Sequence, residues 1–507
     1  MAAPHIGADR PLTHADSTTT LAPSVPPTTT TPIQELDSPK EVKHIADSNK
    51  NPTTNAATTV EDEAPDGGYG WVCTFCSFMI HANTWGIGAP WGIFLDRYVA
   101  QGTFAQVGKF EYAIVGGLAI ALALMVAPLA NCCKRVLGTR WTILLGSVIT
   151  SAGIFASSAA SQVWHLVLSY GLCYGLGMGI LYIPSISVVG PWFSTHRSLA
   201  IGIASAGSGF GGLAYSLLAG KLIATYGIPW TWRIMSFTTF FCNVICGLLI
   251  KDSPVMKSVA SSTSTSKPSS FCFHIFTRPQ VILILVWGFI AELGYVSLYF
   301  SLPSYATTLG LDLTQGSIVQ ALMSLGAAIG RPCVGWVSDR LGRINVALFM
   351  TLFCGLISLA LWIQARSYVP LLVFAVLSGI SSGTFWSTAN PIVTEVVGMR
   401  ESAATYSAVC LVMALPATFG EAIALQFVDE SRTDNAKFLP SQVYVGCTYF
   451  AGAVALLMLR GWRVWELQKK SALVEDPEVA GEKDILPKEK RGYGWMKPGV
   501  WIKGLRV

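Results

Sequence analysis

Two ionisable residues within long apolar stretches are the side chains of this chain best placed to do chemistry. Arg331, followed by Pro332, stands about two helical turns before Asp339, and Glu292 lies in the middle of another apolar stretch. If such stretches cross a membrane, a charge near their centre costs about 2.5–3.5 kcal/mol on insertion scales, which makes each one a functional candidate. A guanidinium grips a carboxylate through two parallel hydrogen bonds and stays charged when desolvated. We therefore interpret Arg331 as an anion-binding or gating residue, in preference to a side chain that reaches along its helix to the membrane surface.

The other candidates for a binding site are polar groups among apolar neighbours. Glu292 has two open interpretations, a proton-carrying partner of Arg331 or a structural hydrogen bond between helices. His81 is interpreted as a packed polar residue rather than a proton relay. Further candidates to line a cavity, because each has a polar tip, are Tyr182, Tyr295, Trp386 and Asn390.

A charged motif closes the stretch that contains Arg331. Gly335-Trp-Val-Ser-Asp339-Arg340-Leu-Gly342-Arg343 places one acid beside two arginines at a helix end. Such charges can pair in one conformation and separate in another, so Asp339, Arg340 and Arg343 are predicted to form a gate. The alternative is that the arginines only mark a cytoplasmic loop and the acid is solvated. Segment 134–140 is the matching loop of the first half of the sequence. It is basic and has a glycine but no aspartate, so the gate contact that it forms should be weaker or built differently.

The elements that must position these residues are membrane-spanning helices. Hydrophobic residues make up 52% of the 507 and charged residues 12%, and the mean hydropathy is +0.50. About 20 apolar residues suffice to cross a bilayer as a helix. Twelve stretches are long enough, and they predict an all-α membrane protein with spans near 70–95, 111–131, 141–160, 165–190, 199–223, 233–250, 279–306, 316–338, 344–365, 368–393, 403–426 and 441–462.

The spans divide into two halves of six. The expected organisation is a disordered cytoplasmic tail (1–65), an N-terminal half (66–250), a serine-rich cytoplasmic linker (251–277), a C-terminal half (278–462) and a cytoplasmic tail (463–507). With the N-terminus inside, the cytoplasmic connections carry eleven Lys and Arg against six outside, which predicts that both termini are cytoplasmic. The net charge of +5 then reflects topology and not binding to nucleic acid.

Three sequence motifs resemble those of a known family. Asp66-Gly-Gly-Tyr-Gly-Trp71 resembles the opening signature of the monocarboxylate transporter family, fungal type, within the major facilitator superfamily. Residues 192–207 are similar to its second signature, and 335–343 match the superfamily's G-x-x-x-D-R-x-G-R pattern. The resemblance covers about 66–462 and implies the major facilitator fold and transport by alternating access. It also places Arg331 where proton-coupled carriers hold the substrate carboxylate.

The chain departs from those carriers at their proton machinery. Ala327 stands where they have an aspartate, and no lysine occurs between Lys50 and Lys109, where they have one in the first span. These departures favour a larger acid or a neutral product over lactate or pyruvate as cargo. The expected function is a secondary transporter of a small organic acid or secondary metabolite, and the resemblance favours export at the plasma membrane. The alternatives are an uptake carrier for a monocarboxylate or vitamin and, from another class, a transporter-like nutrient receptor that signals through its N-terminal tail.

The motifs of enzymes are missing from the sequence. We find no G-x-x-x-x-G-K-[ST] loop and no H-E-x-x-H, and the G-x-G-x-x-G at 207–212 lies inside an apolar helix, where glycines serve packing. We therefore expect no catalytic residues, no cofactor and no metal. The expected partners are a small-molecule substrate and the lipid bilayer, with protons as a candidate coupling ion and no nucleic acid.

Overall fold

The apolar stretches fold as helices, and no β-strand occurs in residues 65–101, 109–254, 276–428 and 435–475, which the computed structural model describes. Nearly all of the predicted N-terminal tail, most of the linker at 251–277 and the chain beyond 475 lie outside these residues. The described ranges all belong to one unit, Ala57–Val507. The all-α prediction is confirmed for the described chain.

The N-terminal half begins with a broken span. The predicted span 70–95 consists of three pieces in the structure, interrupted near Asn83 and before Pro90, whose ring lacks the N–H that a continuous helix needs. The next span is also bent, by 48° between α5 and α6. The elements are α2 (Tyr69–Ala82), α3 (Trp85–Gly88), α4 (Trp91–Gln101), α5 (Lys109–Met125), α6 (Ala127–Leu137), α7 (Thr139–Ser157), α8 (Val163–Leu166), the π-helix η1 (Val167–Tyr174), α9 (Gly175–Val189), η2 (Gly190–Trp192) and α10 (Arg197–Leu249).

Two predicted spans, 199–223 and 233–250, share the 53-residue α10. They are separate helices joined at Gly227, whose φ of 77° is a conformation that glycine adopts without a steric penalty. Pro229 follows two residues later, at the start of the second helix.

The C-terminal half follows the predicted boundaries, except at its end. α18 continues to Glu475, beyond the expected end of the last span at 462, because partly buried residues such as Trp465 and Leu467 extend its packed face. The elements are α12 (Pro279–Thr308), α13 (Leu313–Leu341), α14 (Arg343–Ile357), η4 (Ser358–Trp362), α15 (Tyr368–Ser382), α16 (Thr384–Val397), α17 (Met399–Gln426), η5 (Asn435–Phe438) and α18 (Leu439–Glu475).

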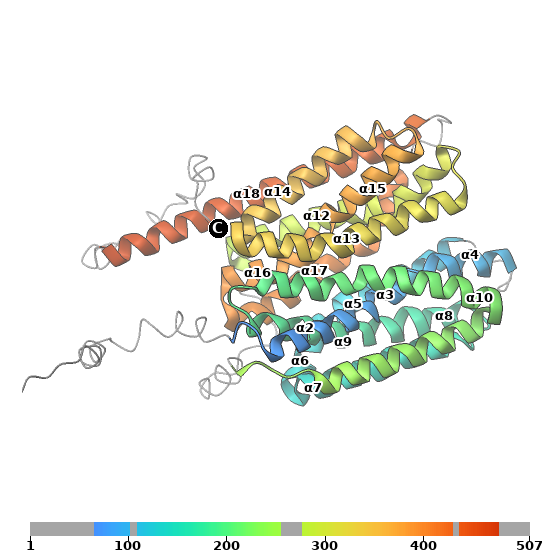
Figure 1. Ribbon diagram of the computed structural model, residues 1–507, viewed down its shortest axis with the longest axis horizontal. Helices are drawn as coiled ribbons and strands as arrows, with labels where there is room; N and C mark the ends of the chain where they lie inside the picture. Colours follow the sequence, from blue (N-terminus) through green and yellow to red (C-terminus); the bar gives the residue numbers. More distant parts are fainter. Residues whose placement is uncertain (1–64, 102–108, 255–275, 429–434, 476–507) are drawn as a thin grey trace, which may run out of the picture. The chain divides into compact units, whose positions relative to one another are not determined.

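Twelve spans result when the broken helices are joined. Nine described helices are long and apolar enough to cross a membrane, and the bent pair α5–α6 makes ten. Dividing α10 at Gly227 adds one, and α2 to α4 together add the last. Figure 1 shows α2–α10 (blue to green) and α12–α18 (yellow to red) as two groups of helices side by side, which we call the N-terminal and C-terminal halves.

Candidate functional site

Arg331 lies between the two halves and binds across them. It is on α13 and only 7% exposed, and its Nη1 donates hydrogen bonds to the Ser205 carbonyl oxygen (2.7 Å) and to the Ser208 hydroxyl, both on α10. α10 and α13 approach closely because Gly202 packs against the Arg331 backbone, where a side chain would clash. The guanidinium is thus held against the opposite half, and does not extend along its own helix toward a membrane surface.

Glu292 is a second buried charge near Arg331. It lies on α12, is 4% exposed, and its Oε2 accepts a hydrogen bond from Trp386 Nε1 at 3.1 Å. Glu292 and Arg331 interact through space but form no ion pair within 4.0 Å, and Tyr295, three residues after Glu292, also interacts with the Arg331 charge. The structure therefore brings together both ionisable candidates and two aromatic ones.

Aromatic rings from both halves meet beside these charges. The Tyr182 hydroxyl on α9 is 3.1 Å from the Tyr406 hydroxyl on α17. The Trp85 ring centre lies 5.6 Å from that of Tyr182 and 5.8 Å from that of Trp386. Trp85 and Tyr406 were not predicted as site residues, because single aromatics in apolar helices give no signal of where they face.

Asn390 is separated from this cluster. It lies one turn beyond Trp386 on α16 and is buried. Its Oδ1 packs near Gly190 in the N-terminal half, where a Cβ added to the glycine would lie 3.8 Å from it. Asn390 thus faces the end of α9 in the N-terminal half.

The predicted gate joins the halves at the end of the bundle where Asp66 lies, which we call the Asp66 end. Asp339 Oδ1 accepts a hydrogen bond from the backbone N–H of Ser198 (3.0 Å) and Oδ2 from that of Leu199 (2.8 Å). These N–H groups belong to the first turn of α10, which has no intrahelical acceptors for them and favours an anion. Arg343 binds Asp339 (3.6 Å) and the Ser198 hydroxyl (3.1 Å). The acid therefore works mainly as a helix cap across the halves.

Arg340 takes no part in this contact. It is exposed, and its guanidinium lies 3.9 Å from the ring centre of Trp336 on its own helix. The structure thus brings Asp339 and Arg343 together with α10, but leaves the third predicted gate residue outside.

A second contact between the halves, which we call the second latch, is made by an amide just before segment 134–140. Asn131 on α6 donates from Nδ2 to the Ala403 carbonyl oxygen (2.8 Å) and to the Ser407 hydroxyl of α17. Asn131 and Gly335 occupy matching positions, each seven residues before a glycine with positive φ. These glycines are Gly138 and Gly342. A neutral amide therefore joins the halves on this side, where a carboxylate does so on the other.

The two signature motifs of the N-terminal half touch each other. The Asp66 carboxylate accepts hydrogen bonds from the backbone N–H groups of Ser194 (2.7 Å) and Thr195 (3.0 Å). Burial acts to raise the pKa of Asp66, but these hydrogen bonds outweigh it and hold the pKa below its ordinary value. The Trp71 ring also packs edge-on to Phe193, with centres 4.9 Å apart. Asp66 therefore anchors the segment that leads into α10.

Comparison with known proteins decides the family. A family model described as Major Facilitator Superfamily matches residues 70–421. The chain belongs to this superfamily. Its members are transporters of small molecules and not enzymes, and the multi-pass membrane fold predicted from the sequence is confirmed.

Individual superfamily relatives agree with this assignment. "Probable transporter MCH2" of Saccharomyces cerevisiae is 29% identical over 84% of this chain and 89% of its own length, and "Monocarboxylate transporter 13" of Rattus norvegicus is 26% identical over 78% and 90%. Among solved structures, the proton:xylose symporter XylE aligns with a TM-score of 0.60 at 13% identity, over 76% of this chain and 94% of that one. FucP, solved in the outward conformation, aligns with a TM-score of 0.57 at 13% identity, over 76% and 99%.

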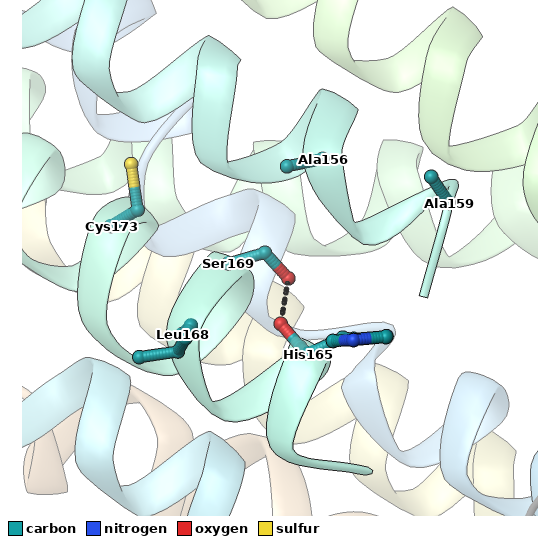
Figure 2. A pocket seen from close by; sticks show the side chains of 6 residues that line it. All are labelled: Ala156, Ala159, His165, Leu168, Ser169 and Cys173. Carbon is teal, nitrogen blue, oxygen red and sulfur yellow. Dashed lines mark hydrogen bonds between the residues drawn. The ribbon is translucent and has the colours of Figure 1, made fainter. Parts of the chain in front are cut away.

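A pocket of about 400 Å³ lies elsewhere in this superfamily member, within the N-terminal half (Figure 2). It is formed by α7, α8 and η1 and lined by Ala156, Ala159, His165, Leu168, Ser169 and Cys173. The one hydrogen bond drawn there, from the Ser169 hydroxyl to the His165 carbonyl oxygen at 2.7 Å, stays within one turn of helix. Leu168 and the adjacent Trp164 are about half exposed, which is typical of a lipid-facing surface. None of the predicted site residues lines this pocket.

Proposed function

We propose that the chain is a carrier of the monocarboxylate-porter type that moves an organic acid by alternating access. The observation that carries this proposal is the position of Arg331, a buried cation between the halves whose fixed contacts use Nη1 and leave Nε without a hydrogen-bond partner among the described residues. A carboxylate is the ligand that a guanidinium in low dielectric binds best. The two signature motifs and the similarity to the rat transporter support the same family.

The proposed cargo is larger than a simple monocarboxylate. Ala327 and the lysine-free first span remove groups that the proton-coupled carriers use, and the rings of Trp85, Tyr182 and Trp386 offer apolar surface near Arg331. We propose export at the plasma membrane, as the fungal resemblance favours. We also propose that both termini are cytoplasmic, as the distribution of Lys and Arg predicts. Uptake of a monocarboxylate or vitamin is the alternative direction.

Metabolite profiling of cells tests both cargo and direction. Cells that express the chain should lose at least one organic acid from the cytoplasm and gain it in the medium, compared with cells that lack the chain. Arg331→Gln should abolish this change, and Arg331→Lys should leave a small part of it, because an ammonium keeps the charge without the paired hydrogen bonds. Identical profiles with and without the chain would contradict export, and unchanged export by Arg331→Gln would contradict the proposed acid site.

We also propose Glu292 as the group through which protons couple to transport. Its carboxyl lies within electrostatic range of Arg331 and is held by a hydrogen bond from Trp386. Glu292→Gln keeps the size of the side chain and the acceptor oxygen but removes the titration. Uptake into vesicles that depends on a pH gradient in the wild type should lose that dependence in the variant. An unchanged pH dependence would leave Glu292 with the structural role that the sequence left open.

A further inference from the structure

His81 has a buried ring nitrogen that no described residue satisfies. The side chain lies on α2 and is 3% exposed, and its Nδ1 is 2.7 Å from the Ser77 carbonyl oxygen. A carbonyl oxygen can only accept, so Nδ1 carries the proton and the neutral imidazole presents Nε2 as an acceptor. Nε2 is buried without a hydrogen-bond partner. Buried polar groups are normally paired, so this atom requires an explanation.

The position of His81 places it at the central aromatic cluster. Its ring centre is 4.9 Å from that of Tyr182, which contacts the C-terminal half through Tyr406. Its Cβ packs against Gly207 of α10, in the same turn that binds Arg331 through Ser205 and Ser208. One turn of α10 therefore has His81 on one side and Arg331 on the other, and the two side chains interact electrostatically.

Two unpaired polar atoms thus come from opposite halves of the transporter. Arg331 Nε, like His81 Nε2, is buried with no hydrogen-bond partner among the described residues. Arg331 Nε is a donor suited to a carboxylate, and His81 Nε2 is an acceptor suited to a hydroxyl or an N–H group. A packing role for His81 does not account for Nε2, because phenylalanine or leucine would fill the same volume without burying a polar atom.

We infer that His81 Nε2 is a second polar contact of the transported molecule, and that it accepts a hydrogen bond from a hydroxyl or amide group on an acid whose carboxylate binds Arg331. This inference rests on the proposed function and specifies its substrate class as hydroxylated or amide-bearing organic acids. An acid without a donor would leave Nε2 unpaired in the closed site. Selection for the donor should amount to about tenfold in affinity, as expected for one buried hydrogen bond.

Paired acids test this selectivity directly. The full-length chain in nanodiscs would be titrated calorimetrically with phenylacetate and 4-hydroxyphenylacetate, and with butyrate and 4-hydroxybutyrate. The wild type should bind the hydroxylated member of at least one pair about tenfold more tightly. His81→Phe should abolish this preference, because an acid without a hydroxyl then leaves no buried acceptor unpaired. His81→Asn, whose amide oxygen accepts, should keep part of the preference.

A buried serine of the same half supplies the control. Ser147 bonds only within its own helix, to the Ile143 carbonyl oxygen at 2.8 Å, so Ser147→Ala should keep the wild-type preference. The inference is overturned if His81→Phe retains the preference, or if it weakens both members of a pair equally, as a structural role would. If His81→Phe does not fold, His81→Leu provides the same comparison, because leucine also lacks an acceptor.

The outcomes also separate this inference from the proposed function. Acids that bind the wild type in an Arg331-dependent way, but with no preference for a hydroxyl, would refute the role of His81 and leave the acid site standing. Failure of all four acids to bind the wild type would contradict the acid site itself, and the inference with it.

Discussion

Replacing Asp339 with asparagine should open the contact between the halves at the Asp66 end. The carboxylate accepts two backbone hydrogen bonds, from Ser198 and Leu199, and lies 3.6 Å from Arg343. An amide has one accepting oxygen, so at least one of these charge-assisted bonds is lost. Such a bond contributes about 1.5–3 kcal/mol, and it exists only while the halves are joined at this end. The equilibrium between the conformations that are closed and open at the Asp66 end should therefore shift about tenfold to about 150-fold toward the open one.

Hydrogen exchange at the start of α10 measures this shift. The N–H groups of Ser198 and Leu199 precede that of Ala200, which makes the first hydrogen bond of the helix, to the His196 carbonyl oxygen at 3.0 Å. Asp339 therefore supplies their protection from solvent. Exchange in a peptide covering these two residues should accelerate by the same factor in Asp339→Asn. Arg340→Ala is the matched control, because the Arg340 guanidinium stacks on Trp336 of its own helix. Unchanged exchange in a folded Asp339→Asn protein would refute the capping role, as would equal acceleration in the control.

Three further experiments, with four substitutions, probe the same end of the molecule. Asn131→Ala and Ser407→Ala should be coupled by about 0.5–1.5 kcal/mol in a double-mutant cycle of thermal unfolding, whereas purely additive losses would show that the second latch is absent. Gly335→Ala places a methyl group against the Ser198 carbonyl oxygen and should destabilise the conformation in which the halves are joined by about 1–3 kcal/mol. The measurement is hydrogen exchange of the Ser198 N–H, which should become faster. Asp66→Asn should lower the melting temperature at neutral pH. Because folding lowers the Asp66 pKa, the wild type loses this carboxylate's stabilisation as the pH falls below about 4, and the difference in melting temperature between the two proteins should shrink there. A difference that stays constant with pH would contradict this.

The sequence predicted the helical architecture well because the bilayer imposes strong rules. A span needs about 20 apolar residues, so composition alone located the helices, and α12 begins and ends within two residues of the predicted 279–306. The break near Asn83 and the extension of α18 to Glu475 were not predicted. Both depend on local hydrogen bonding and packing, to which average hydropathy is insensitive.

The candidate site was only partly predictable. Arg331 and Glu292 stand out in a sequence because a charge inside a membrane needs a reason. Trp85 and Tyr406 do not, since an aromatic side chain suits the lipid-facing and the inward-facing sides of a helix equally. Arg340 belongs to a gate motif by sequence and packs on Trp336 of its own helix in the structure, so its part in a gate stays a prediction.

The sequence by itself determined that this chain is a membrane transporter of the major facilitator type, and it singled out the charges worth attention. Both conclusions follow from local rules, namely the cost of polarity in lipid and the spacing of a few motifs. Only the tertiary structure decided that Asp339 caps α10, that Asn131 provides a second latch, and that His81 and Arg331 flank one turn of α10. These contacts join residues more than a hundred positions apart, and the packing of helices alone determines which of them meet.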